Sequence, residues 1–197
     1  MINRVKMFMS VLGAERLTES NRLLKYGVKI TIDLFSENLE SITVFVNAEK
    51  LKLLELADHV TACEFPLGFN YRTSTKQVED IKPKLDAIAG EPFELDLNVQ
   101  DASFFTELHI LEPANYGVNM YYYVLGIRFS SFGNFFTVWS NSISEKIDIS
   151  KIAEIISETE AAGFVFIDAE TLEQKYTGKN RHLANLDNWR LRYFDYL

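Results

Sequence analysis

The sequence predicts a single α+β domain over residues 1–197, in which a largely antiparallel sheet is packed with a few amphipathic helices. Three observations predict this fold class. Several stretches alternate apolar and polar residues, which is typical of half-buried strands. Other stretches repeat apolar residues every three or four positions, as amphipathic helices do. The strands and helices do not alternate regularly along the chain, so a doubly wound parallel sheet is not expected.

The first third of the chain predicts helices on either side of a hairpin. Residues 18–25 form a short helical pattern that ends before a glycine. The alternating run 28–34 and the following run 42–46 predict two antiparallel strands joined by a longer loop. Asn47 is suited to cap a helix that extends to about residue 60.

The next helix is predicted from a capping box and a terminal glycine. Ser74 and Gln77 have the spacing at which two side chains satisfy the backbone at a helix start. Gly90 suits the end of this helix. Pro83 interrupts the pattern, so we expect a kink or a division into two short helices.

The middle of the chain predicts the sheet. Four strand-like runs follow one another at residues 93–99, 104–111, 120–129 and 132–139. In the first run, Glu94 and Asp96 share a face that should be wet. In the second, Glu107 and His109 are expected on the same face as Phe105 and Leu111. The last two runs are expected to pair as a strong antiparallel core.

The last quarter predicts a helix, a strand and a docked tail. Residues 150–162 have a helical pattern with Ser150 as the cap and Gly163 at the end. Residues 164–167 form a short apolar run that predicts a buried strand. Residues 188–197 contain four aromatic side chains, and so many aromatics favour packing of the tail against the core.

Composition restricts the function. The chain has 20 Lys and Arg against 28 Asp and Glu, a net charge of −8, so neither nucleic acid nor an anionic membrane is an expected partner. One cysteine permits no intrachain disulfide, which fits a cytoplasmic protein. The N-terminal residues predict neither a signal peptide nor a spanning helix, and we expect a soluble protein.

No pattern predicts a catalytic residue, a cofactor or a metal site. The spacings of hydrolase elbows and zinc ligands are absent. His59 and Cys63 are four residues apart and could share a helix face, but Cys63 is interpreted as a small packed hydrophobe. The segment 177–180 contains a Gly-Lys pair without the rest of a phosphate-binding loop, and it is predicted to be a turn. Arg190 and Arg192 lie between aromatics in what we interpret as a structural tail.

A pattern over the last quarter resembles a known group of proteins. It consists of the helix 150–162, the run 163–168, the segment 176–178 and the aromatic ending 189–197. This ending is similar to that of small cytosolic bacterial immunity proteins, which neutralise secreted polymorphic toxins by binding them. The resemblance implies a non-enzymatic, protein-binding function. It transfers no binding residue, because such families bind through differing surfaces.

The candidate partner-binding residues are therefore chosen from the acidic character of the chain. An acidic face would favour encounter with a basic toxin domain. The candidates are Glu94, Asp96, Glu107, Glu112 and Tyr116. Two alternatives stay open: an enzyme with an unrecognised active site, for example around His59 and Cys63, and a structural subunit of a homo-oligomer.

Overall fold

The structure, a computed structural model, describes residues 28–30, 42–44, 48–113, 121–139, 147 and 149–196. They belong to two compact units, Met1–Ala48 and Glu49–Leu197, which are described separately. In the first unit, β1 (Val28–Ile30) pairs antiparallel with β2 (Ile42–Val44). The predicted hairpin is confirmed over these residues, whereas the helix predicted at 18–25 lies outside the described ones.

The second unit contains a five-stranded sheet. Its order is β3-β4-β5-β6-β7, and β3 to β6 pair antiparallel, each with the next. The fifth strand pairs parallel with β6. The bounds are β3 (Glu94–Asp96), β4 (Phe104–Pro113), β5 (Tyr121–Ser130), β6 (Phe135–Trp139) and β7 (Val165–Phe166). This largely antiparallel sheet with helices is the predicted α+β fold, although β3 is shorter than the run 93–99 had indicated.

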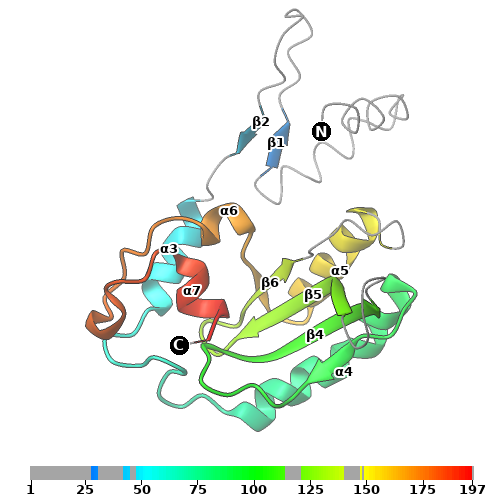
Figure 1. The fold of residues 1–197 in the computed structure, drawn as a ribbon, viewed down its shortest axis with the longest axis horizontal. Helices are drawn as coiled ribbons and strands as arrows, with labels where there is room; N and C mark the ends of the chain where they lie inside the picture. The colour runs from blue at the N-terminus through cyan, green and yellow to red at the C-terminus, as the bar shows by residue number, and fades with distance from the viewer. Residues whose placement is uncertain are drawn as a thin grey trace, which may run out of the picture. The chain divides into compact units, whose positions relative to one another are not determined.

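Two helices cover one face of this sheet (Figure 1). They are α4 (Tyr71–Ala89) and α5 (Ile149–Ala161). The core between helices and sheet consists of side chains that are almost wholly buried: Val78, Leu85, Leu108, Leu125, Ile127, Phe129, Phe136, Ile155 and Ile156. Helix α5 ends before Gly163, whose φ of +96° confirms the predicted helix end.

Helix α4 differs from its predicted form at its start and at its proline. It begins at Tyr71, because the side chain of Asn70 accepts a hydrogen bond from Thr73 N at 3.1 Å and caps the helix there. The capping box expected at Ser74 is therefore wrong. The helix also continues through Pro83 instead of dividing. Pro83 lies on the exposed side, where water can bind the carbonyl group that a proline leaves unpaired.

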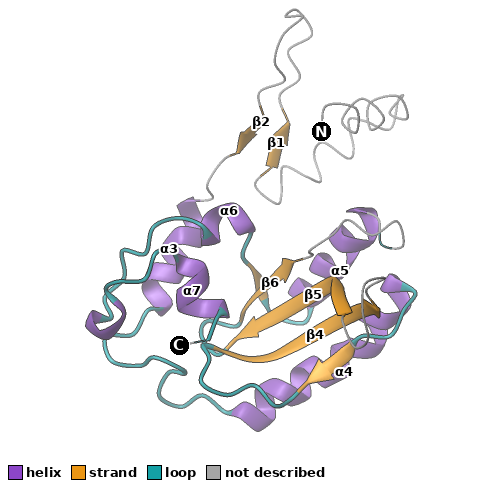
Figure 2. Cartoon of the chain, viewed as in Figure 1, coloured by secondary structure: helices purple, strands orange, loops and turns teal. Residues whose placement is uncertain are grey.

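A second group of helices lies beside the sheet, at the end near the C-terminus (Figures 1 and 2). It comprises α3 (Ala48–Ala57), α6 (Ala169–Leu172), the 3-10 helix η1 (Arg181–Leu183) and α7 (Trp189–Phe194). Trp189, Tyr193 and Phe194 are buried here, which confirms that the aromatic tail docks on the core. No helix in the described part of the chain is both long and apolar enough to cross a membrane.

Candidate functional site

A β-bulge decides which side chains share a face of the sheet. Phe105 is the extra residue of this bulge between β4 and β5. Its ring lies 6.3 Å from that of Phe129, on the side covered by the helices. The prediction that Phe105 shares a face with Glu107 and His109 is therefore wrong, because the bulge shifts the alternation by one residue.

The other face carries α7 at one end, where Arg128 bonds the Phe194 carbonyl oxygen, and we call the strand surface beside α7 the open face. The register of the strands places its side chains next to one another: His109 lies opposite Glu94 and Gly126, and Glu107 lies opposite Asp96 and Arg128. The open face is defined by Glu94, Asp96, Glu107, His109, Tyr123, Arg128 and Trp139. Three of the five predicted binding residues thus lie together on it.

Arg128 is the centre of the open face. It donates a hydrogen bond from Nε to Glu107 and one of 2.9 Å from Nη1 to the carbonyl oxygen of Phe194. Its guanidinium lies 4.7 Å from the ring centre of Phe104 and 4.9 Å from that of Trp139. Glu107 is buried, while the Arg128 side chain is 21% exposed. The cation is held in one position and still reaches solvent.

His109 extends this charged cluster. Its Nδ1 lies 3.5 Å from Glu107 Oε1, and its Nε2 lies 3.5 Å from Glu94 Oε2. The Glu107 carboxylate raises the pKa of His109, which outweighs the opposing effect of burial. Burial alone would raise the pKa of Glu107, but the contacts with His109 and Arg128 leave it below its usual value. Both shifts favour the ion-paired state.

Trp139 lies flat on the open face. A Cβ at Gly126 would be 2.5 Å from Trp139 Nε1, so only glycine leaves room for the indole. The Tyr123 ring lies 4.3 Å from the Trp139 ring. The indole Nε1 is buried without a hydrogen-bond partner among the described residues.

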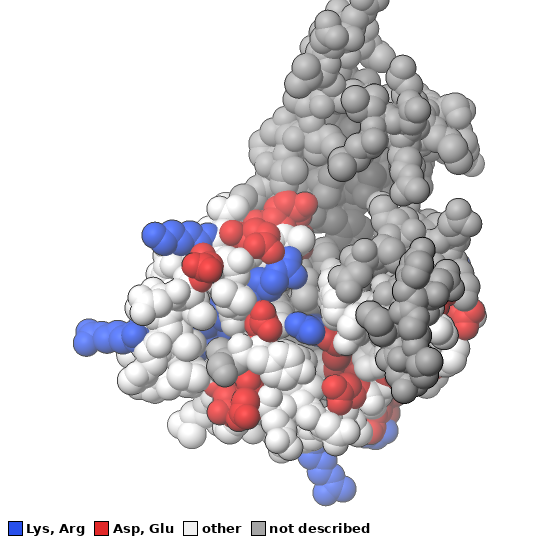
Figure 3. Space-filling view, viewed as in Figure 1, with Lys and Arg blue, Asp and Glu red and all other residues white. Residues whose placement is uncertain are grey.

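The remaining predicted residues lie elsewhere. Alternation along β4 places Glu112 on the side opposite Glu107, towards the helix-covered face. Tyr116 lies outside the described residues. Over the described part of the surface in Figure 3, acidic side chains are separated by uncharged surface and by basic ones, so they form no continuous acidic field.

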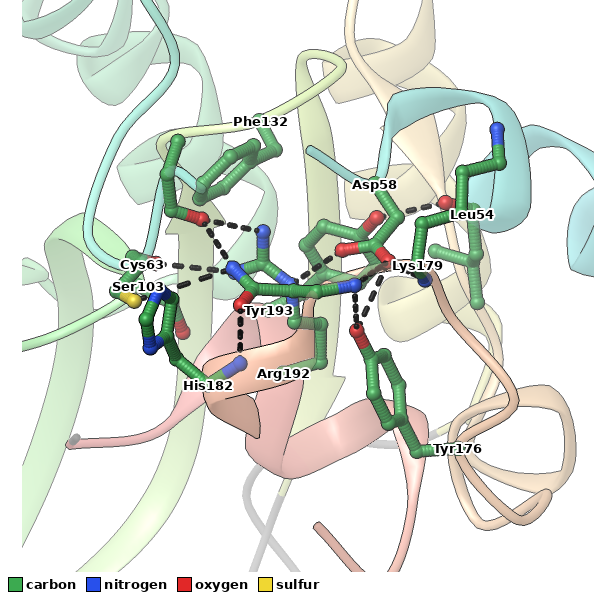
Figure 4. A network of polar contacts seen from close by, with 12 residues as sticks. Leu54, Asp58, Cys63, Ser103, Phe132, Tyr176, Lys179, His182, Arg192 and Tyr193 are labelled. Atoms are coloured by element: carbon green, nitrogen blue, oxygen red, sulfur yellow. Dashed lines mark hydrogen bonds and ion pairs between the residues drawn. The ribbon is translucent and has the colours of Figure 1, made fainter. Parts of the chain in front are cut away.

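A second polar cluster is enclosed between α3 and α7 (Figure 4). Asp58 directly follows α3, and its Oδ1 accepts a hydrogen bond of 2.7 Å from Arg192 Nε in α7. Both side chains are wholly buried. The guanidinium also donates to the carbonyl oxygens of Cys63 and Ala62, at 2.9 and 3.0 Å. All three guanidinium nitrogens are thus bound inside the protein.

The other carboxylate oxygen of Asp58 binds the predicted turn. It accepts hydrogen bonds from Tyr176 Oη at 2.8 Å, Lys179 N at 2.5 Å and Asn180 N at 3.3 Å. A Cβ at Gly178 would lie 2.3 Å from this oxygen. Burial, followed by the bond to Asp58, raises the pKa of Tyr176 to about 12, so the phenol keeps its proton. The Gly-Lys segment does bind an anion, but the anion is a carboxylate of the same chain.

The expectation that His59 and Cys63 share a helix face is wrong. Helix α3 ends at Ala57, so the two residues do not lie on a common helix face. His59 is exposed, and the Sγ of Cys63 lies 3.9 Å from Asn180 Nδ2. Within the described ranges, no three His, Cys, Asp or Glu side chains are grouped as metal ligands would be.

The spacing of residues in the C-terminal tail is one sequence signal for a buried arginine. In a helical tail, Arg192 falls three residues after Trp189 and beside Tyr193, on the side that must be buried. A buried guanidinium requires an acidic partner. Nothing in the sequence, however, indicates which of the acidic residues that partner is.

The two clusters permit different chemistry. The pair of Asp58 and Arg192 is sealed from solvent, so it can neither bind nor convert a substrate in this arrangement. The open face presents a positioned cation, two aromatic rings and acidic groups at the surface, which suits recognition. No family model, curated protein or solved structure matches this chain.

Proposed function

We propose that this protein is a non-enzymatic binding domain, an immunity protein that neutralises a bacterial toxin by occluding it. The observation that carries the proposal is the composition of the open face. Trp139, Tyr123 and Arg128 lie together there, and these residue types are the ones enriched in the energetic centres of protein interfaces. The toxin as partner is supported by the resemblance of the C-terminal quarter.

The arrangement of Arg128 supports recognition in preference to simple solvation. A side chain already held by Glu107 and by the Phe194 carbonyl loses little conformational entropy when a partner binds. A guanidinium stacked on aromatic rings also offers donors in a fixed plane, which suits carboxylates and carbonyl groups of a partner.

The acidic residues support a basic partner. Glu94 is exposed beside His109, and Asp96 is the next acidic side chain on the same face of β3. A net charge of −8 increases the rate at which a basic protein is encountered. The proposed toxin domain would therefore carry basic groups around the surface that the open face occludes, and no cofactor would take part.

Affinity purification followed by a quantitative binding assay tests this proposal. The full chain, tagged and expressed in its own cells, should retain one protein, whose affinity is then measured by titration calorimetry. Trp139→Ala should weaken binding about 30-fold or more, as loss of an interface centre does. Glu94→Lys should also weaken binding, and the loss of affinity should be larger at low salt than at high salt.

Glu79→Lys is the matched control, because it makes the same charge change on the exposed side of α4. It should leave the affinity within about threefold of the wild type, as expected for a charge outside the interface. Co-expression of the chain should also restore growth to cells that produce the retained protein. Retention of no protein, or equal affinities of Trp139→Ala and the wild type, would contradict the proposal.

A further inference from the structure

On the open face, His109 lies between two carboxylates that differ in their access to solvent. Its Nε2 is 3.5 Å from Glu94 Oε2, and its Nδ1 is 3.5 Å from Glu107 Oε1. The side chain of Glu94 is 75% exposed, whereas that of Glu107 is 5% exposed. A group of another protein can therefore reach Glu94 but not Glu107. The imidazole is 14% exposed, so a proton can pass between it and water.

The imidazole is positioned by more than its contact with Glu94. Tyr123 packs edge-on against the imidazole, with ring centres 5.6 Å apart. Glu107 is itself fixed by its bond to Arg128. The strand register places Glu94 directly opposite His109. A partner that engages Glu94 therefore meets an imidazole whose place is already set.

The groups around His109 determine which of its protonation states is favoured. Besides Glu94 and Glu107, the side chains near it on this face are Asp96 of β3, Tyr123 and Arg128 of β5, and Trp139 of β6. From α7, the backbone carbonyl of Phe194 reaches this face. Burial raises the pKa of Tyr123, so its phenol stays neutral where histidine titrates. Glu107, followed by Glu94, raises the pKa of His109, which favours the protonated imidazole in the free protein.

We infer that the open face binds a basic side chain of the partner at Glu94, in exchange for the proton of His109. The inference rests on the proposed function and adds to it the chemistry of one contact. An ammonium or guanidinium group at Glu94 repels protonated His109, which lies beside the same carboxylate. The proton therefore passes from the imidazole to water when the partner binds. Glu107 keeps its bond to Arg128, so the exchange is confined to Glu94 and His109.

The charge of the open face selects a basic group over an acidic one. Three carboxylates, those of Glu94, Asp96 and Glu107, share this face with one permanent cation, Arg128. The face is therefore negative whether or not His109 carries a proton. A basic side chain complements this charge, whereas an acidic one would be repelled by it.

Exchange of a proton makes the affinity depend on pH. Protons and the partner compete for the same carboxylate, so binding weakens as the pH falls. Release of one proton changes the affinity by up to about tenfold for each pH unit. We expect the wild type to bind its partner about tenfold or more tightly at pH 8 than at pH 6, since histidine titrates in this range.

Titration calorimetry of full-length variants measures the proton directly. The probe is the purified protein that the wild type retains. Binding is measured at pH 7 in phosphate and in Tris, because the difference in heat between buffers of unlike ionisation enthalpy gives the number of protons released. His109→Gln should release fewer protons than the wild type. His59→Gln is the matched control, with the same change at an exposed histidine outside the open face, and should release as many as the wild type. Titrating groups of the partner contribute equally to all three measurements.

Two variants separate the histidine from the carboxylate. At pH 6, His109→Gln should bind about threefold or more tightly than the wild type, because no imidazolium competes for Glu94. Glu94→Gln changes a side chain that is exposed and does not depend on burial for its place. It should weaken binding at pH 8 by about threefold or more, as loss of an exposed charge contact does. Its proton release should fall to that of His109→Gln.

Each outcome decides for or against the exchange. Reduced proton release in both His109→Gln and Glu94→Gln supports it. Equal release by the wild type and His109→Gln, with weakened binding of Trp139→Ala, overturns the exchange and leaves the proposed function standing. Uptake of a proton that is lost in His109→Gln also overturns the exchange, since His109 would then contact an acidic group of the partner. Retention of no protein by the wild type overturns both proposals.

Discussion

The molecule contains two carboxylate–guanidinium pairs in contrasting surroundings. The pair of Asp58 and Arg192 is wholly buried, and both carboxylate oxygens and all three guanidinium nitrogens bind groups of the protein. The pair of Glu107 and Arg128 is partly exposed, with its cation stacked on aromatic rings at the surface of the sheet. The same two functional groups therefore occur once in a sealed network and once on an open face.

The contrast indicates different roles. A buried pair rarely adds much stability over an apolar core, but removal of one partner leaves an unpaired buried charge, so the pair fixes one arrangement of the chain. Here it joins α7 to the end of α3 and to the loop that follows. A partly exposed pair contributes less to stability and keeps its groups available to a partner. Four variants sharpen this comparison, in descending order of expected effect.

Arg192→Ala should have the largest effect. It leaves the Asp58 carboxylate buried without its cation and removes two bonds to loop carbonyls. The free energy of unfolding, measured by urea denaturation, should fall by about 3–5 kcal/mol. Arg72→Ala, at an exposed arginine on α4, is the control and should change it by less than about 0.5 kcal/mol. A loss below about 1 kcal/mol for Arg192→Ala would contradict a structural role.

Gly178→Ala should have a smaller effect. The added Cβ would approach Asp58 Oδ2 and the Tyr176 ring to within 2.4 Å, and neither can move without breaking their mutual hydrogen bond. We expect the free energy of unfolding, measured by thermal or chemical denaturation, to fall by about 1–3 kcal/mol, as is usual when a core is overpacked. A variant as stable as the wild type would show that the network adapts.

His109→Gln tests the open face through its pH dependence. Glu107 raises the pKa of His109 in the folded protein, so protonated His109 stabilises the fold. This stabilisation is fully present below the pKa of histidine in the unfolded chain, about 6.5. It is lost as the pH rises through the folded pKa. The wild type should thus exceed His109→Gln in stability by more at pH 6 than at pH 9. Denaturant titrations at both values measure this difference, and a difference independent of pH would refute the ion-paired arrangement.

Leu67→Ala should have the smallest effect on folding. The side chain is almost fully exposed, so its removal creates no cavity. The free energy of unfolding should change by less than about 0.5 kcal/mol in the same denaturation assay. A decrease in the free energy of unfolding of more than about 1 kcal/mol would mean that Leu67 packs against the rest of the protein.

Local patterns predicted most of the elements. Strand-like apolar runs identified β4 to β6, and the positive φ of Gly90 matches the predicted end of α4. Errors arose where two local rules competed. The side chain of Asn70 caps α4 one turn before the capping box at Ser74 could do so. The bulge at Phe105 inverted one side-chain direction, and no residue type signals such a bulge.

The sites were harder to predict than the fold, because they depend on distant pairs. Asp58 and Arg192 are 134 residues apart, and any of the 28 acidic residues could have been the partner of the arginine. Part of the open face could be predicted, because alternation within a single strand places Glu94 and Asp96 on one face. Its central residues, Arg128 and Trp139, come from strands whose register the sequence does not give.

The most direct test of the contrast is a comparison of Asp58→Asn with Glu107→Gln, two amide replacements of equal size. Both free energies of unfolding are measured by denaturation at pH 7. We expect a loss of about 3–5 kcal/mol for Asp58→Asn, since Arg192 is then buried without an anion. Glu107→Gln should lose less than half as much, because Arg128 reaches solvent and keeps its bond to the Phe194 carbonyl. Equal losses, or a larger loss for Glu107→Gln, would contradict the division into a structural and a binding pair.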